Sequence, residues 1–197
     1  MGIDLGIFDR IMDNGEYIEW VGKAEPFKLA DAANKKALNI RWLICAAVAV
    51  ILTAVYIIST FSRDLEIQTV IPVITICVPL FIALRPMLDK GTINKKLIFA
   101  LTNKRAIVYK SETDYSGMAL DKTDAVKFTD KGSGIGDVVL GKAAVEAPES
   151  KLRYIALVPK TSYNGDEKLV TGLVFYNIAE IGKVKELLEQ KIQISAK

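Results

Sequence analysis

The chain has 197 residues, of which 51% are hydrophobic, and a formal net charge of +3 at pH 7. It contains no histidine and only two cysteines, Cys45 and Cys77, both within long apolar runs. Within this chain, Ser-His-Asp and Cys-His catalysis are therefore excluded, as is a zinc site built from Cys and His outside those runs. We expect no enzymatic activity, no cofactor and no metal.

Two apolar runs without a charged side chain lie in the first half of the chain, at 42–62 and 67–84. With a rise of 1.5 Å per residue they extend about 31 and about 27 Å, close to the ~30 Å hydrocarbon core of a bilayer. Only four residues separate them. The pattern predicts a transmembrane helical hairpin within residues 28–90. A soluble protein of this length has too little other chain to bury both runs.

The second run contains Gln68, Pro72 and Pro79, which are unusual in a helix that only faces lipid. Prolines are tolerated in membrane helices when neighbouring groups satisfy the freed carbonyls, so a kinked helix without a special role is one interpretation. The other is that these three residues mark a face that packs against another membrane protein.

Positively charged residues flank the hairpin on both sides, whereas the connection at 63–66 contains only Arg63. The positive-inside rule then predicts a multi-pass protein of the cell (inner or plasma) membrane with both termini in the cytoplasm. Residues 1–27 would form an N-terminal cytoplasmic segment. Within it, Leu5, Phe8 and Met12 share one helical face, which predicts an amphipathic helix lying on the bilayer or against the rest of the protein.

Residues 95–195 change to short alternating segments that predict a cytoplasmic domain of seven antiparallel strands. The predicted strands are 97–101, 105–110, 117–120, 125–129, 137–140, 152–158 and 169–175.

A helix is predicted to close the domain. Asn177 is placed to cap its N-terminus, with Glu180 in the capping-box position. An apolar stripe follows, which indicates that the helix lies on the open end of the sheet. The stripe consists of Ile178, Ile181, Val184, Leu188 and Ile192.

Seven strands followed by a helix is the order of the pleckstrin-homology (PH) superfold. The segment 99–110, with Thr-Asn-Lys-Arg at 102–105, resembles the strand–TNKR–strand signature of bacterial PH (bPH) domains. The segment 16–23 is similar to the "E…W.G" stretch that precedes the membrane helices of such proteins. The resemblance implies an α+β fold, in which a transmembrane hairpin precedes a PH-like seven-stranded antiparallel barrel or sandwich closed by a C-terminal amphipathic helix.

Basic residues gather around the first predicted hairpin of strands and form a candidate surface for anionic lipid or a partner. They are Lys95, Lys96, Lys104, Arg105 and Lys110. Two simpler interpretations remain open, namely positive-inside flanking for the first two and a family turn signature for Lys104 and Arg105. Residues 85–197 hold 19 Lys and Arg against 14 Asp and Glu. This mild excess favours generic attraction to anionic headgroups and not nucleic-acid binding.

These observations predict a membrane-anchored binding or scaffolding module with a protein partner or a second copy of itself. The alternative is an accessory subunit whose hairpin packs into a larger transporter, secretion or energy-converting complex.

The predicted topology is testable by cysteine labelling in intact cells. A cysteine at Asp64 should react with a membrane-impermeant reagent added outside, whereas a cysteine at Lys151 should react only after lysis. The reverse pattern would show that the domain faces outward.

Overall fold

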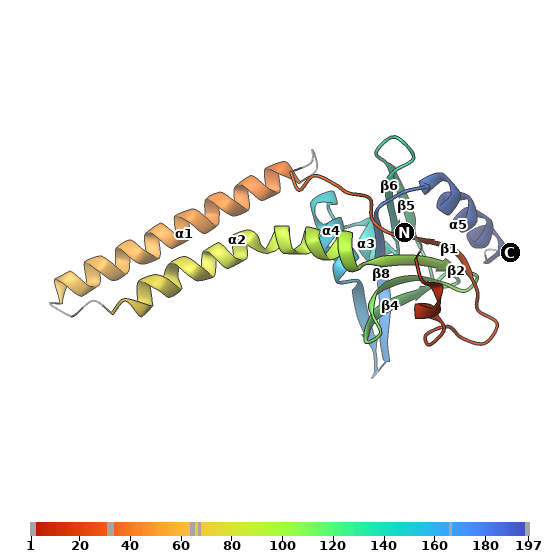
Figure 1. Cartoon of the computed structure of the whole chain (residues 1–197), viewed down its shortest axis with the longest axis horizontal. Helices are drawn as coiled ribbons and strands as arrows, with labels where there is room; N and C mark the ends of the chain where they lie inside the picture. The colour runs from red at the N-terminus through yellow and green to blue at the C-terminus, as the bar shows by residue number, and fades with distance from the viewer. Residues whose placement is uncertain (1–2, 31–33, 64–65, 67, 166, 196–197) are drawn as a thin grey trace. The chain divides into compact units, whose positions relative to one another are not determined.

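The computed structural model describes residues 3–30, 34–63, 66, 68–165 and 167–195 (Figure 1). The chain forms two compact units: Lys28–Lys90, and Met1–Phe27 together with Gly91–Lys197. The sequence predicts residues 1–27 as a segment of their own. In the structure that segment belongs to the same unit as the C-terminal domain, so the hairpin is an insertion within the domain's chain.

The hairpin consists of α1 (Lys35–Ser62) and α2 (Val70–Lys96), both long and apolar enough to span a membrane. In their most apolar windows only 6% and 11% of the residues are buried, so neither is packed within this chain as a core helix would be. The two helices are tied by a hydrogen bond between the hydroxyls of Thr53 and Thr75 at 3.2 Å. Asp64, Leu65 and Ile67 of the predicted turn and second span lie outside the described residues.

The domain has two antiparallel sheets of four strands each, with orders β1-β2-β3-β4 and β5-β6-β8-β7. This confirms the mixed α+β class with two long apolar helices. The described residues hold eight strands in place of the predicted seven, and the strands do not form a closed barrel. The bounds are β1 Ile18–Gly22, β2 Ile98–Thr102, β3 Arg105–Ser111, β4 Asp114–Ala119, β5 Val126–Asp130, β6 Gly136–Leu140, β7 Lys160–Asn164 and β8 Glu167–Ile178.

The predicted strand at 152–158 is wrong, because these residues belong to helix α4 (Glu149–Leu157), which follows the short α3 (Lys142–Val145). A strand would place Tyr154 on the same face as Leu152. Tyr154 is instead 47% exposed, whereas Leu152, Ile155 and Ala156 are buried at helical spacing. The hairpin partner of β8 is β7, which begins after Pro159.

The predicted capping role of Asn177 is also wrong. Asn177 lies within β8 with a φ of 52°, and α5 begins only at Ile181 and extends to Ser195. Ile178 therefore belongs to β8 and not to the helical stripe. Ile181, Val184 and Leu188 do form a buried stripe on α5, as predicted. The side chain of Ile192 lies outside the described part of the chain.

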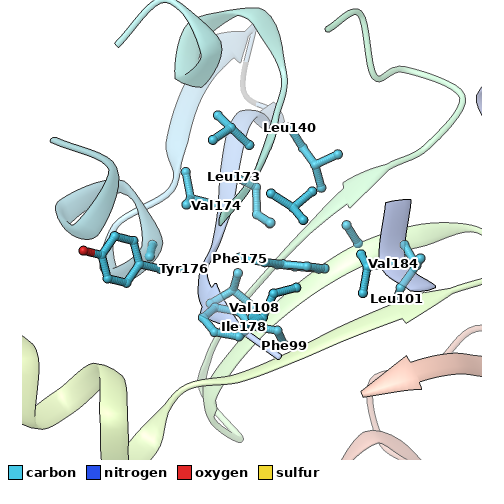
Figure 2. Close-up of a cluster of buried hydrophobic side chains, with 14 of the residues drawn as sticks. Phe99, Leu101, Val108, Leu140, Leu173, Val174, Phe175, Tyr176, Ile178 and Val184 are labelled. Carbon is cyan, nitrogen blue, oxygen red and sulfur yellow. The ribbon is translucent and has the colours of Figure 1, made fainter. Parts of the chain in front are cut away.

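One hydrophobic core joins the two sheets with α3, α4, α5 and the end of α2 (Figure 2). Phe175 of β8 lies at its centre, with its ring centroid 5.3 Å from that of Phe99 and 5.8 Å from that of Trp20. Val184 of α5 closes one side and is fully buried. Trp20 comes from β1, so the core is incomplete without the segment that precedes the hairpin.

A smaller cluster lies on the outer face of the first sheet. There the 3₁₀ helix η1 (Leu5–Phe8) places Phe8 against Tyr109, with ring centroids 5.5 Å apart, and the Phe8 side chain is fully buried. Ala100 and Ile107 complete this cluster. Of the two placements predicted for the N-terminal amphipathic segment, the structure therefore shows packing against the domain, in a 3₁₀ helix of four residues.

The contribution of β1 predicts that a fragment from Lys95 to the C-terminus will not fold stably. It contains every strand predicted from the sequence, but it lacks Trp20 and leaves the outer edge of β2 unpaired. A chain that joins residues 3–27 to 91–197 through a flexible Gly/Ser linker restores both. We expect a cooperative thermal transition by circular dichroism for the joined chain and aggregation for the fragment. Equal melting of the two would show that the N-terminal segment is dispensable.

Candidate functional site

The Thr-Asn-Lys-Arg turn between β2 and β3 binds the N-terminal segment and not solvent. The Asn103 side-chain oxygen accepts a hydrogen bond from the Tyr17 amide at 3.0 Å. Its amide nitrogen donates to the Gly15 carbonyl at 3.1 Å. The Asn103 side chain therefore pairs with one backbone N–H and one backbone C=O of the N-terminal segment.

Arg105 and Glu16 form the strongest contact of this turn. The Arg105 Nε and Nη2 atoms donate to the two carboxylate oxygens of Glu16 at 2.9 and 2.8 Å. Thr102 also donates to Glu16, at 2.7 Å. The Glu16 side chain is fully buried and that of Arg105 is 22% exposed. A bidentate pair of this kind is strong, and leaving either member alone in this environment is costly.

The protonation of Glu16 follows from these contacts. Burial by itself would raise the pKa of Glu16, but hydrogen bonds from Arg105, the Asp13 amide and Thr102, together with the charge of Arg105, lower that pKa below its ordinary value. Burial opposes the charge of Arg105 too, yet its contacts with Glu16 raise the Arg105 pKa. Both groups are therefore charged at neutral pH.

The structure does not bring the five basic candidates together as a free surface. Lys104 donates to the Asn14 carbonyl at 2.7 Å, Arg105 binds Glu16, and Lys110 pairs with Asp114. Lys95 and Lys96 are exposed in the last turn of α2. The turn signature thus forms an internal clamp, although the Lys104 side chain stays exposed, as do those of Lys95 and Lys96.

A second clamp holds the other end of the N-terminal segment. The Glu25 amide donates to the Asn177 carbonyl at 2.7 Å, and the Asn177 side chain donates back to the Glu25 carbonyl at 2.8 Å. The buried Asp137 carboxylate accepts from the Asn177 amide and from Lys131, each at 2.7 Å. The left-handed backbone of Asn177, which asparagine tolerates better than most residues, directs these groups. No local sequence pattern around Asn177 indicates this role.

The three intramembrane candidates lie in different environments. The Gln68 backbone bonds the Tyr56 hydroxyl at 2.8 and 3.1 Å, which links the two ends of the hairpin turn. Pro72 lies in the first turn of α2, where proline costs no hydrogen bond. Pro79 lies inside α2 and lines an apolar groove of about 400 Å³ between α1 and α2.

The described part of the domain has cavities on its surface, of which two bear on the site. One, of about 630 Å³, collects Lys104, Arg105 and Lys191 together with Asp13 and Asp121. Arg105 and Lys191 are already paired with Glu16 and Glu19, so this cavity is a poor anion site. The other, of about 340 Å³, lies between β4 and β8.

The residues described by the structure contain no group of three or more His, Cys, Asp or Glu placed to hold a metal ion. The chain matches no protein-family model, no curated protein and no solved structure. The residues and geometry of the chain are therefore the basis for a functional proposal.

The buried clamp predicts a large effect for Glu16→Gln. Replacing the carboxylate leaves Arg105 without its charged partner, and we expect a loss of about 1.5–3 kcal/mol in the free energy of unfolding. Urea unfolding of the full chain in detergent, followed by Trp20 fluorescence in a Trp42→Phe background, measures it. The matched control is Glu112→Gln, which breaks the exposed pair with Arg10 and should cost under about 1 kcal/mol.

The same pair predicts a dependence on pH. Because the pKa of Glu16 is lowered on folding, its stabilisation is complete above the ordinary value near 4.5 and is lost as the pH falls through the lower folded-state value. The difference between the parent and Glu16→Gln should thus shrink on acidification below about pH 4.5. A difference that is constant with pH would contradict an ionised Glu16.

Proposed function

We propose that this chain is a membrane-anchored binding or scaffolding module, related in fold to bPH-domain proteins. In this proposal α1 and α2 cross the cell membrane and both termini lie in the cytoplasm. The domain then docks a protein partner close to the inner leaflet. In this proposal the chain acts by holding its partner close to the membrane surface and not by catalysing a reaction.

The observation that carries the proposal is the position of the hairpin within the domain's chain. The hairpin is inserted between β1 and β2, two paired strands of one sheet. Ile93 and Leu97, at and after the end of α2, are fully buried in the core. Leu97 alone separates α2 from β2, and this short connection supports a domain that docks its partner close to the bilayer.

Lipid contact is a supporting part of the proposal. Lys95 and Lys96 lie in the last turn of α2, beyond the end of its apolar run at Leu84 and on the headgroup side of that run in this proposal. Each such charge contributes about 1 kcal/mol of attraction to an anionic surface, which orients the domain without requiring a specific lipid.

The second candidate is the accessory subunit, and the groove between α1 and α2 favours it. Its lining includes Val48, Val78 and Pro79 and exposes no polar surface. A shape of this kind suits a helix of another membrane protein, because helix packing in bilayers depends on close van der Waals contact.

Site-specific photocrosslinking in cells discriminates between the two candidates. Benzoylphenylalanine at Tyr115, Tyr154 and Tyr163, exposed residues of β4, α4 and β7, samples the domain. The same group at Leu52 and Val78 samples the groove. We expect protein adducts from at least one domain position and none from the groove. Adducts confined to the groove would favour the accessory subunit, and a lack of adducts at all positions would contradict both candidates.

A further inference from the structure

The groove between α1 and α2 is as long as one leaflet of a bilayer is deep. Its lining extends from Ile44 to Leu52 on α1 and from Ile74 to Ile82 on α2. At 1.5 Å per residue, each wall is about 12 Å long. Half of the ~30 Å hydrocarbon core is about 15 Å. A transmembrane helix of another protein packs along most of the span, so this length favours a single acyl chain as the occupant.

Hydrogen bonds between the two helices hold the groove open at both ends. The Trp42 indole N–H donates to the Ala83 carbonyl at 3.1 Å near one end, and the hydroxyls of Thr53 and Thr75 bond to each other at 3.2 Å near the other. The volume of about 400 Å³ lies within the roughly 300–1,000 Å³ of small-molecule sites. A ligand can therefore enter without separating the helices.

Two arginines continue the groove beyond its apolar part. On α1, Arg41 precedes the lining residues Ile44 and Val48 by three and seven positions, so the three share one face of the helix. On α2, Arg85 follows the lining residue Ile82 by three positions and lies on its face. Both arginine side chains are exposed. One end of the groove therefore has a positive charge on each helix.

These arginines lie where lipid phosphates would be in a bilayer. Arg41 directly precedes the first apolar run and Arg85 directly follows the second. Asp89 is the one acidic residue within four positions of either arginine, and no ion pair joins it to Arg85 in the described part of the hairpin. Guanidinium groups bind phosphate through paired N–H donors. The positive end thus complements a phosphate, and the apolar walls complement the chain attached to it.

We propose that the groove binds one phospholipid of the inner leaflet with an anionic headgroup. One acyl chain lies between α1 and α2, and Arg41 and Arg85 bind the phosphate. The inference rests on the proposed function for the placement of the hairpin in the membrane. A zwitterionic headgroup brings an ammonium group towards the two arginines, whereas an anionic one does not, so the site favours a lipid of net negative charge.

The test uses the full chain in nanodiscs of phosphatidylcholine with equal minor shares of phosphatidylglycerol and phosphatidylethanolamine. Native mass spectrometry counts the lipids that stay bound when the chain is released from the disc. We expect one retained lipid, with phosphatidylglycerol favoured about tenfold over phosphatidylethanolamine because two positive charges face its headgroup. Absence of a retained lipid, or equal retention of the two, would overturn the proposal.

A pair of double variants separates binding at the groove from general attraction to a basic surface. Arg41→Gln/Arg85→Gln should abolish the preference for phosphatidylglycerol. Lys35→Gln/Lys36→Gln removes the same charge from the first turn of α1, away from the face of the groove, and should keep the preference. Equal loss of the preference in both double variants would overturn the proposal.

A pair of single variants tests the place of the acyl chain. Val48→Trp fills the groove and should remove the retained lipid, because the chain then has no room. Val50→Trp adds the same side chain to α1 at a position that is 68% exposed and outside the groove lining, so it should retain the lipid. Retention by both variants would overturn the proposal. A dimer in place of the lipid that Val48→Trp alone dissociates would assign the groove to a second copy and overturn it too.

Failure of the lipid site is distinguishable from failure of the proposed function. If no lipid is retained while the domain positions still crosslink a partner, the lipid site is wrong and the scaffold stands. If phosphatidylglycerol is retained as described and the domain positions give no adducts, the lipid site is supported and the scaffold is not. A chain that does not enter nanodiscs would contradict both, since each requires the hairpin to lie in a membrane.

Discussion

The bidentate contact between Glu16 and Arg105 is the interaction on which the rest of the domain depends. The two residues are 89 positions apart in sequence, and the hairpin lies between them. Their contact holds the N-terminal segment so that β1 pairs with β2 and Trp20 enters the core. The Asn177 clamp holds the far end of the same segment. The domain is therefore closed by two polar contacts made to residues that precede the hairpin.

This arrangement gives a physical reason for the residues that resemble bPH signatures. Glu16 binds the turn that contains Arg105, and Trp20 stacks on Phe175. A Cβ at Gly22 would lie 2.5 Å from the Trp20 ring, so glycine is needed for the ring to lie there. The segment that contains Glu16 precedes the hairpin in the sequence and the turn that contains Arg105 follows it, yet the two contact each other in the fold. The basic turn resembles a lipid site in the sequence, but its polar groups bind the N-terminal segment.

Elements with a strong local pattern could be predicted from the sequence, and elements fixed by distant contacts could not. The apolar runs, the strands flanking Thr102–Arg105 and the stripe containing Leu188 follow from periodicity alone. The helix at 149–157 was missed because Leu152, Tyr154 and Ala156 also alternate as in a strand. Nothing local to Asn177 reveals its bond to the Glu25 carbonyl, and nothing near Arg105 identifies Glu16 as its partner.

The insertion of the hairpin between β1 and β2 imposes an order on biosynthesis. Phe8 and Trp20 leave the ribosome early, but their partners Tyr109 and Phe175 are made only after both apolar helices. At about 5–20 residues per second, Trp20 waits roughly 8–30 s for Phe175. Through that interval the nascent N-terminal segment has no sheet to join, because β2 is synthesised only after both apolar helices. Both apolar helices are therefore synthesised before the core of the domain can close.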